Sequence, residues 1–319
     1  MTRVFVYEYL SGGGLMDGDG AESEELLSMG LSMRSAVLDD LMRLNDCIIG
    51  AATGVGMPAP LAPVLPVTPR AGEAPFDFVA RESAAHDLTW VIAPETDGLL
   101  AGFHRVVEPD RWLGCDGDSI RLATAKRATL LRLAAHGVTT PLAFIDAPEV
   151  SRWVVKPDDG AGGVATRVHT REGSARHDWS QRSVDGAALS LEPWVEGEPL
   201  SLSLLCTSAG TELLSVNRQH IAIDGAGQLA FRGVEVNAIA ATDPRTPRLR
   251  ALAAQVRQSI PGLQGFVGID LVWHAHCGPV VIEVNPRVTC AYAGLSSALG
   301  RNLAADVMQA HFQTLHAHA

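Results

Sequence analysis

The sequence predicts an α/β protein in which a Rossmann-like domain with a parallel sheet precedes two subdomains with antiparallel sheets. Strand-like and helix-like segments alternate over the first ~115 residues, the pattern of a parallel sheet with crossover helices. Residues 190–240 instead resemble consecutive antiparallel strands, and two more apolar strands flank a short turn further on. We expect three units, at 1–117, 118–190 and 191–319.

The N-terminal unit begins with a strand, RVFVYEYL, and a glycine loop. An amphipathic helix over 22–44 carries acids in its first turn, which suit the positive end of a helix. DCIIGAAT is a second strand, and five prolines between 58 and 69 predict a loop. A buried strand then ends at Pro94, so Glu95 lies at the carboxyl edge where open α/β sheets bind ligands.

The middle and C-terminal units carry the remaining elements. A helix over 119–136 carries Lys126 and ends before a glycine. The strand RWVVK delivers Lys156 to a glycine-rich loop. Six further elements follow, in this order: the strands LSLSLLC and ELLSVNRQHIAI, a helix over 247–259, the strands GFVGIDLVW and PVVIEVN, and a C-terminal helix.

Composition narrows the classes of function. The 319-residue chain has a formal charge of -11 and a pI near 5.4, which argues against a nucleic-acid or anionic-membrane partner. It has no apolar run long enough to span a membrane, and its N-terminal apolar run is too short for a signal peptide. Five scattered cysteines suit free thiols, so we expect a cytoplasmic protein and leave a homodimer open.

The segment GIDLVWHAHCGPVVIEVNPR predicts a hairpin. Side chains alternate across a strand, so Glu283 and Asn285 share one face. The other face carries Val280, Ile282 and Val284.

A symmetric turn in this hairpin pairs Trp273 with Val280 and places Asp270 opposite Glu283. Two bare carboxylates about 5 Å apart repel by roughly 3 kcal/mol at an effective dielectric near 20, so a cation is expected between them. Oxygen ligands without histidine or cysteine favour Mg²⁺ that also holds substrate phosphates. The alternative is a pair of solvent-facing acids, which leaves the neighbouring Asn285 and Arg287 unexplained. A zinc site at His274, His276 and Cys277 is a weaker alternative, because a tight turn makes these side chains diverge.

Lysine is rare in this chain: of 25 lysines and arginines, only Lys126 and Lys156 are lysines. A lysine retained in such a chain suggests a site for a flexible ammonium. The glycines after Lys156 let backbone N–H groups approach phosphate oxygens, although the order is not that of a Walker A loop. The loop residues predicted to bind nucleotide are Asp159, Gly160, Gly162 and Gly163.

The segment LEPWVEGEPLSLS is a candidate purine site. Backbone groups at Trp194 and Val195 would read the base, and Glu192 or Glu198 would take the ribose hydroxyls. The alternative is a polar hairpin turn with a buried tryptophan.

The order of lysine, lysine with glycine loop, hinge acid and D...ExN resembles the ATP-grasp superfamily over roughly residues 115–300. The Asp270, Glu283, Asn285 spacing is similar to that of D-alanine:D-alanine ligases. VFVYEYLSGGG, VIAPETDGLL and SVNRQH resemble the ATP-grasp group that contains tyramine:L-glutamate ligase of methanofuran biosynthesis. Two departures are Ala125, where many members have aspartate, and Gly268, where D-alanine ligases have arginine.

The resemblance implies an ATP-dependent carboxylate–amine ligase that forms an acyl phosphate and releases ADP and phosphate. Lys126 and Lys156 would hold α- and β-phosphates. Asp270 and Glu283 would hold one Mg²⁺, and Glu283 and Asn285 a second, with Mn²⁺ as a substitute. Arg287, with Arg218 as second candidate, would stabilise the transferring phosphoryl group.

The substrates would be a small carboxylate, with glutamate as a candidate, and an amine. Either Glu8 or Glu95 could pair with a substrate ammonium, or could equally be the partner of a helix N-cap. The candidate substrate-binding residues are Glu8, Gly12, Gly13, Gly14, Glu95, Tyr292 and Ser296, the last two bounding a segment.

Three other readings stay open at this point. One is a carboxylase or kinase of the same superfamily, and another is a nucleotide sensor without chemistry. The third is a dinucleotide-dependent oxidoreductase using GAATGVG or SGGG, although the prolines after GAATGVG leave no helix to receive a pyrophosphate.

Overall fold

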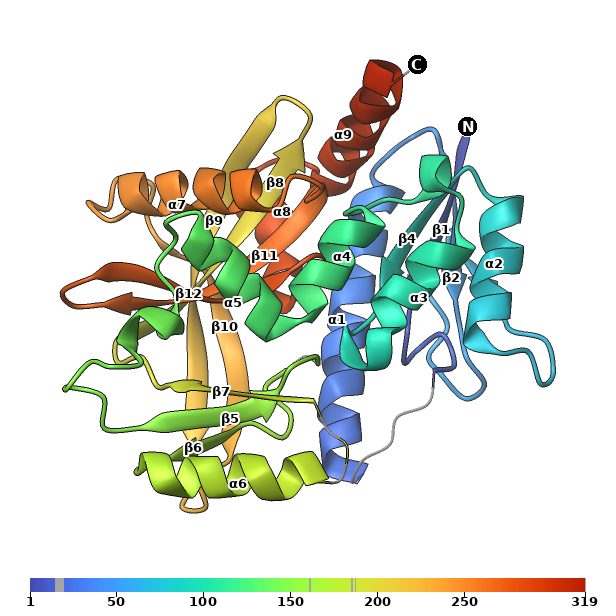
Figure 1. Ribbon diagram of the computed structural model, residues 1–319. Helices are drawn as coiled ribbons and strands as arrows, with labels where there is room; N and C mark the ends of the chain where they lie inside the picture. Colours follow the sequence, from blue (N-terminus) through green and yellow to red (C-terminus); the bar gives the residue numbers. More distant parts are fainter. Residues whose placement is uncertain (15–19, 161, 185, 187, 319) are drawn as a thin grey trace.

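The computed structural model describes residues 1–14, 20–160, 162–184, 186 and 188–318. Three sheets organise these residues, with strand orders β3-β2-β1-β4, β6-β5-β7 and β10-β9-β8-β11-β12 (Figure 1). The first is parallel and the other two are antiparallel, as the sequence predicts. No helix among the described residues is long and apolar enough to cross a membrane.

The parallel sheet contains β1 (Thr2–Glu8), β2 (Cys47–Ala52), β3 (Leu65–Val67) and β4 (Leu88–Ile92). The helices of this part are α1 (Gly20–Met42), α2 (Pro75–Ala85) and α3 (Leu99–Val106), with short turns η1 (Thr96–Gly98) and η2 (Pro109–Arg111). The strand order reverses between β1 and β4, and the carboxyl edge at such a switch point is where these sheets bind ligands.

One expectation for this sheet is wrong. The proline-rich segment is not entirely loop, because β3 pairs with β2 through Pro66 opposite Ala51. A proline lacks an N–H donor, but an edge strand needs donors on one side only. The chain after GAATGVG therefore leads to a strand, and within the described residues that follow it no helix N-terminus is placed to receive a dinucleotide.

The helix expected over 119–136 is two helices, α4 (Gly117–Thr124) and α5 (Lys126–Ala135). They are separated by Ala125, whose ψ of 93° is extended. The N–H of Lys126 donates to the backbone oxygen of Asp158 at 2.8 Å instead of continuing the helical pattern. The break places Lys126 at the first position of α5 and ties it to the chain that follows β5.

The small sheet contains β5 (Trp153–Pro157), β6 (Arg167–His169) and β7 (Leu189–Pro193). The turn η3 (Pro141–Phe144) precedes it, and α6 (Glu172–Val184) packs on β5 and β7. The predicted boundary at residue 190 falls inside β7, so the sheets favour a boundary in the segment 194–197.

The large sheet contains β8 (Glu198–Thr207), β9 (Gly210–Ile223), β10 (Leu229–Ile239), β11 (Gly265–His274) and β12 (Gly278–Asn285). Helix α7 (Thr246–Ser259), turn η4 (Cys290–Tyr292), α8 (Leu295–Leu299) and α9 (Leu303–His318) complete the chain. The long β9–β10 ribbon reaches the small sheet (Figure 1), where Val168 N–H donates to Gly227 O at 2.8 Å.

Alternation gives the large sheet one face that packs against α7. Ile269, Leu202 and Val216 lie side by side on β11, β8 and β9 and join Leu249 of α7 in one core cluster. At the other end of the opposite face, Phe266 packs with residues of α8 and α9. Between Phe266 and a small apolar cluster at Val272 and Val280, that opposite face is polar and carries the predicted metal ligands.

Candidate functional site

The hairpin places the two predicted carboxylates opposite each other. Asp270 pairs with Glu283, as the sequence predicts, but Trp273 pairs with Pro279 and not with Val280. A register shift between Asp270 and Leu271 inserts an extra residue into β12, which is a β-bulge.

The bulge also corrects the predicted faces of β12. Val284 joins the main core together with Val281, whereas Val280 and Ile282 belong to a separate cluster beside η3. The three valine and isoleucine side chains expected on one face therefore divide between two.

Four polar side chains form a row across the large sheet. Glu283, Asp270, Ser201 and Asn217 occupy directly paired positions on β12, β11, β8 and β9, so they share a face. Asn217 is fully buried, and its amide donates to Ser203 Oγ at 3.1 Å. A buried amide satisfied in this way holds the polar face rigid.

The carboxylate of Asp270 is oriented by two amides. Gln219 Nε2 donates to Asp270 Oδ1 at 2.9 Å, and Asn285 Nδ2 donates to Oδ2 at 3.2 Å. Burial, and next the charge of Glu283, raise the pKa of Asp270 to about 7. Since Asn285 uses its nitrogen, its oxygen is available as a third oxygen ligand beside the two carboxylates. This donor set fits a hard divalent cation.

Lys126 lies between the glycine loop and the carboxylates. Its Nζ donates to Gly160 O at 2.8 Å and is 3.4 Å from Glu283 Oε1, and the side chain is buried. The structure therefore brings together one predicted phosphate ligand and one predicted metal ligand, which the sequence separates by 157 positions (283 minus 126).

Lys156 lies on β5 and pairs with Glu192 of β7. Its Nζ is 2.5 Å from Glu192 Oε1, and both side chains are buried. Among the residues that the structure describes, Glu192 Oε2, Ser190 Oγ and Trp194 Nε1 are buried without a hydrogen-bond partner. Buried polar atoms without partners are rare, and this set, two on β7 and one directly after it, is suited to a ligand with both donors and acceptors.

The hinge segment after β7 uses part of its backbone internally. Trp194 N–H donates to Arg152 O at 2.9 Å, and the Arg152 guanidinium stacks over the Trp194 ring with 4.7 Å to the ring centroid. This bond leaves Val195 as the backbone candidate for reading a base.

The glycine loop rests on the N-terminal domain. Asp159 Oδ2 accepts the N–H of Asp97 at 2.8 Å. Gly160, Gly162 and Gly163 all have positive φ, at 111°, 71° and 73°, a conformation that side chains disfavour. Residue 161 lies outside the described residues.

Arg287 forms a forked ion pair with Glu95. Its Nε and Nη2 donate to the two carboxylate oxygens at 2.9 and 2.8 Å, and the Glu95 residue is 2% exposed. The Arg287 charge is close enough to lower the pKa of Asp270. An arginine at position 268 would force Thr289 to shift, because a Cβ on Gly268 would lie 2.6 Å from Thr289 Cγ2.

Two predicted site residues lie on the other face of the sheet. Arg218 alternates with Asn217 and Gln219, so it points away from Asp270. It pairs with Glu198 at 3.0 Å, and Glu198 also pairs with Arg245 at the start of α7. The catalytic role expected for Arg218 and the nucleotide role expected for Glu198 do not fit these positions.

The substrate candidates of the N-terminal domain have structural partners. Glu8 accepts the N–H groups of Leu10 and Ser11 at 3.2 and 2.8 Å, and so closes the turn after β1. A Cβ on Gly12 would lie 2.6 Å from the Tyr7 ring, whereas a Cβ on Gly13 would make only ordinary contacts, at 3.7 Å, but the φ of Gly13 is 102°. These glycines are required by the tight turn that they form.

Tyr292 and Ser296 are also buried away from the polar row. Both hydroxyl groups donate to Asp40 of α1, at 2.7 and 2.5 Å. Their contacts fasten η4 and α8 to α1, so their placement does not support the substrate role expected for them.

The histidine turn is not a metal centre. The N–H groups of His276 and Cys277 donate to His274 Nδ1 at 3.3 and 3.1 Å, which removes that nitrogen as a ligand. Within the described part of the chain, no three histidine, cysteine or acidic side chains cluster as a metal site, and the oxygen set above has two carboxylates and an amide.

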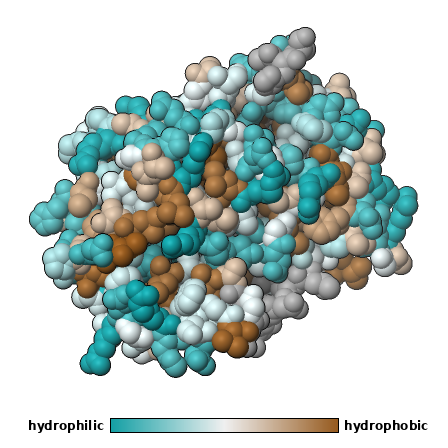
Figure 2. All heavy atoms as spheres, in the orientation of Figure 1, coloured by the Kyte–Doolittle hydropathy of each residue, from teal (hydrophilic) through white to brown (hydrophobic). Residues whose placement is uncertain are grey.

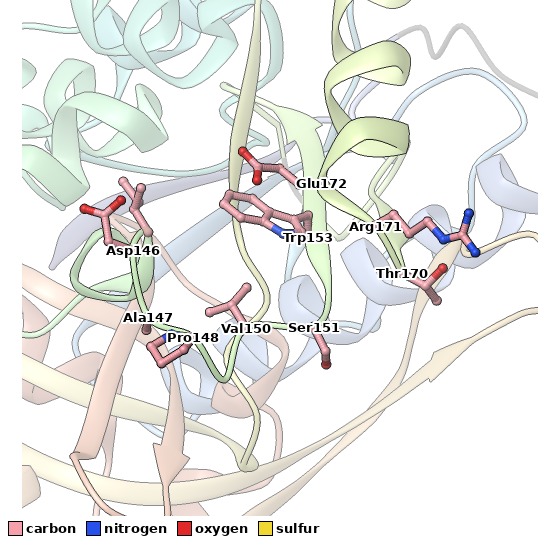
Figure 3. A pocket seen from close by; sticks show the side chains of 10 residues that line it. Asp146, Ala147, Pro148, Val150, Ser151, Trp153, Thr170, Arg171 and Glu172 are labelled. Carbon is pink, nitrogen blue, oxygen red and sulfur yellow. The ribbon is translucent and has the colours of Figure 1, made fainter.

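A shallow pocket of about 470 Å³ lies elsewhere, between the loop after η3, the start of β5 and the chain before α6 (Figure 3). The ten described residues that line it include none of the predicted site residues. Apolar groups interrupt an otherwise largely hydrophilic surface on this side of the molecule (Figure 2).

Sequence reasoning missed one contributor, Gln219. Gln219 could have been found, because alternation along SVNRQH puts it on the face of Asn217.

The family comparisons agree with this arrangement. The model of the ATP-grasp domain matches residues 123–291, more than half of the chain, and the pre ATP-grasp 3 domain matches residues 53–120. No curated protein matches the chain by sequence.

Solved structures share the fold. A protein from Archaeoglobus fulgidus attributed to the ATP-grasp superfamily has a TM-score of 0.68 at 20% identity, over 97% of this chain and 88% of its own. D-alanine–D-alanine ligase from Bacillus anthracis complexed with ATP has 0.66 at 15%, over 98% of each chain. L-amino acid ligase from Bacillus licheniformis has 0.66 at 15%, over 98% of this chain and 74% of its own. With the domain match over more than half of its length, the chain belongs to the ATP-grasp family.

Proposed function

We propose that this protein is an ATP-dependent carboxylate–amine ligase that forms an amide through an acyl phosphate. The observation that carries the proposal is the position of Lys126, whose ammonium touches both the glycine loop and Glu283 of the polar face. A phosphate chain placed there would meet cation, loop and metal ligands together.

The nucleotide would lie between the small and large sheets. Lys156 and Lys126 would hold the α- and β-phosphates, and the loop from Asp159 to Gly163 would cover them. The unpartnered Glu192 oxygen would accept from the base or ribose, with the Val195 backbone beside it.

Asp270, Glu283 and Asn285 would hold Mg²⁺, with a second ion shared by Glu283 and Asn285. When bound, the cation would neutralise the phosphate charge and align the transferring group. The hydrogen bonds from Gln219 and Asn285 fix the Asp270 carboxylate, so the ligand geometry requires little rearrangement.

The reaction would proceed in two transfers. A substrate carboxylate oxygen attacks the γ-phosphorus of ATP, the bond to ADP breaks, and an acyl phosphate forms. The neutral amine then attacks the acyl carbon, phosphate leaves with its electron pair, and the amine proton passes to solvent. Arg287 would stabilise charge on the phosphoryl group and on the tetrahedral adduct.

The substrates are a small carboxylate and an amine. Two proteins of the same fold are named as amino acid ligases, which supports amino acids as the first carboxylates to test. The motifs similar to the tyramine:L-glutamate ligase group make glutamate with tyramine or a furan-methylamine the first pair. We also propose that residues 1–117 form the N-terminal domain, that the lid runs from residue 118 through β7 to the segment 194–197, and that the metal-binding subdomain follows it to residue 319.

The test is ADP release from ATP and Mg²⁺ against a matrix of amino acids and amines. The proposal expects release that requires both a carboxylate and an amine, with an amide detected by mass spectrometry. Release with a carboxylate or alcohol alone would favour the carboxylase or kinase alternative, and AMP with pyrophosphate would exclude the acyl-phosphate route.

A further inference from the structure

Glu95 has a different role from the ones that its position in the sequence suggests. As a partner for a substrate ammonium it is already engaged, because both of its oxygens accept charged N–H groups of Arg287. As a helix-capping residue it fails, because its side chain makes no hydrogen bond to the start of η1. We propose that Glu95 is a positioning residue that aims Arg287 at the transferring phosphoryl group.

The hydrogen bonds of Arg287 define the direction in which it points. A guanidinium has five N–H donors. Nε and one N–H of Nη2 go to Glu95, and one N–H of Nη1 goes to Val288 O at 3.1 Å. One N–H of each terminal nitrogen remains, and two donors on one guanidinium can bind two phosphate oxygens.

Arg287 also lies beside the acidic pair. Its charge acts on Asp270, and the charge of Glu283 acts on it, so the guanidinium is close to both. A long side chain without Glu95 could turn toward either carboxylate and close the metal site. Glu95 therefore holds the Arg287 guanidinium within reach of the phosphoryl group and keeps it away from the carboxylates that would bind the metal.

The turn that carries Glu95 also holds the glycine loop. Asp97 has a φ of 53°, which non-glycine residues seldom adopt, and in this conformation its N–H donates to Asp159 at 2.8 Å. A Cβ at Gly160 would lie 3.5 Å from Thr96 Oγ1. The short segment from Glu95 to Asp97, at the switch point of the parallel sheet, thus contacts both Arg287 and the glycine loop and helps to fix their positions.

A second forked pair offers a matched control. Arg81 donates through Nε and Nη2 to the two oxygens of Glu73, both at 2.7 Å, in the same geometry as Arg287 and Glu95. This pair lies on α2 and the loop before it, with no part in the proposed site. Glu73→Gln is therefore the same chemical change without the proposed role.

The role of Glu95 rests on the proposed function. The experiment measures the melting temperature, kcat and the KM for ATP of Glu95→Gln and compares them with those of Glu73→Gln. We expect Glu95→Gln to lower kcat by about 10²-fold, the cost of misplacing a reacting group by about 1 Å, with the KM for ATP within about threefold. Glu73→Gln should keep both parameters within about twofold. If Glu95→Gln does not fold, Glu95→Asp replaces it, with a smaller loss of kcat at unchanged KM.

A charge swap, Glu95→Arg with Arg287→Glu, keeps an ion pair at this place but moves the guanidinium. It therefore separates the positioning of Arg287 for catalysis from the contribution of the ion pair to the stability of the fold. The swapped pair should recover the melting temperature lost in Glu95→Gln without recovering turnover. Recovery of turnover in the swap, or wild-type kcat in Glu95→Gln, would overturn the positioning role alone. An inactive wild-type protein would overturn the proposed function and this role with it.

Discussion

The two faces of the large sheet come from the same strands and differ in nearly every property. One face carries Leu202, Val216 and Ile269 against α7, and these side chains are at most 2% exposed. The other carries the row of Glu283 and Asp270 with its buried serines and amides. Alternation of adjacent residues, Ser201 beside Leu202 and Ile269 beside Asp270, lets one apolar core support a rigid polar site.

The difference teaches which residues belong to the site. Arg218 and Glu198 lie within a few positions of Asn217 and Ser201 in the sequence, yet they project toward α7. Nearness along the chain therefore does not show which residues belong to the site. What matters is whether a strand residue is an odd or an even number of positions from a known site residue, because this decides the face on which its side chain lies.

The largest effect should follow from removing a carboxylate from the polar face. Glu283→Gln keeps the volume and removes a charge that contacts Lys126, so turnover should fall by at least about 10²-fold with the fold intact. Glu212→Gln on β9, an exposed carboxylate paired with Arg301, is the control and should retain activity. Steady-state ADP release measures both, and near wild-type turnover in Glu283→Gln would remove the metal assignment.

Removing a side chain from the apolar face should act on stability. Leu202→Ala creates a cavity under α7 and should lower the free energy of unfolding by about 2–5 kcal/mol. Its neighbour Ser203 accepts one hydrogen bond from Asn217, so Ser203→Ala should cost about 1 kcal/mol. Denaturant unfolding compares the two, and equal losses would contradict the division of the faces.

The two carboxylates on the polar face should make the free energy of unfolding of the metal-free protein depend on pH. The folded pKa of Asp270, about 7, exceeds the unfolded value near 3.9. The folded state then binds more protons between about pH 4 and 7, so this group makes stability fall as pH rises through that window and level off above it. Asp270→Asn should abolish that fall. A parallel pH profile in wild type and Asp270→Asn, measured by urea unfolding in chelator, would contradict the raised pKa.

The smallest effect is expected for Arg218→Gln. Its guanidinium is on the α7 face and partly exposed, so turnover should stay within about twofold of wild type. A loss comparable to that of Glu283→Gln would place Arg218 in the site after all.

Much of the architecture could be predicted because its signals are local. Strand alternation and a short turn led to the observed pair of Asp270 and Glu283, but from a turn register that is wrong by one residue and that the bulge offsets. The bulge between this pair and the turn could not be predicted, because the extra residue, Ile282, continues the apolar run of Val280 and Val281 and carries no signal of its own. The break at Ala125 lies in a run of good helix formers and depends on a contact with Asp158.

The side-chain partners of the site were the hardest to predict. Glu95 meets Arg287 across 192 positions, and Tyr292 meets Asp40 across 252. Neither pairing produces a periodic pattern in the sequence. The position of Glu95, Tyr292 and Ser296 at loop ends therefore suggested substrate binding for all three. Only the three-dimensional contacts separate a positioning carboxylate from two hydroxyl groups that fasten η4 and α8 to α1.

The most direct test of the central claim is isotope transfer from the carboxylate substrate. With ¹⁸O in the carboxylate of the active amino acid, an acyl-phosphate route moves one labelled oxygen into the released phosphate. We expect one ¹⁸O per phosphate in the wild-type reaction, and phosphate release at least about 10²-fold slower in Glu283→Gln. Label in AMP, or unlabelled phosphate formed together with the amide, would contradict the mechanism proposed for the polar face.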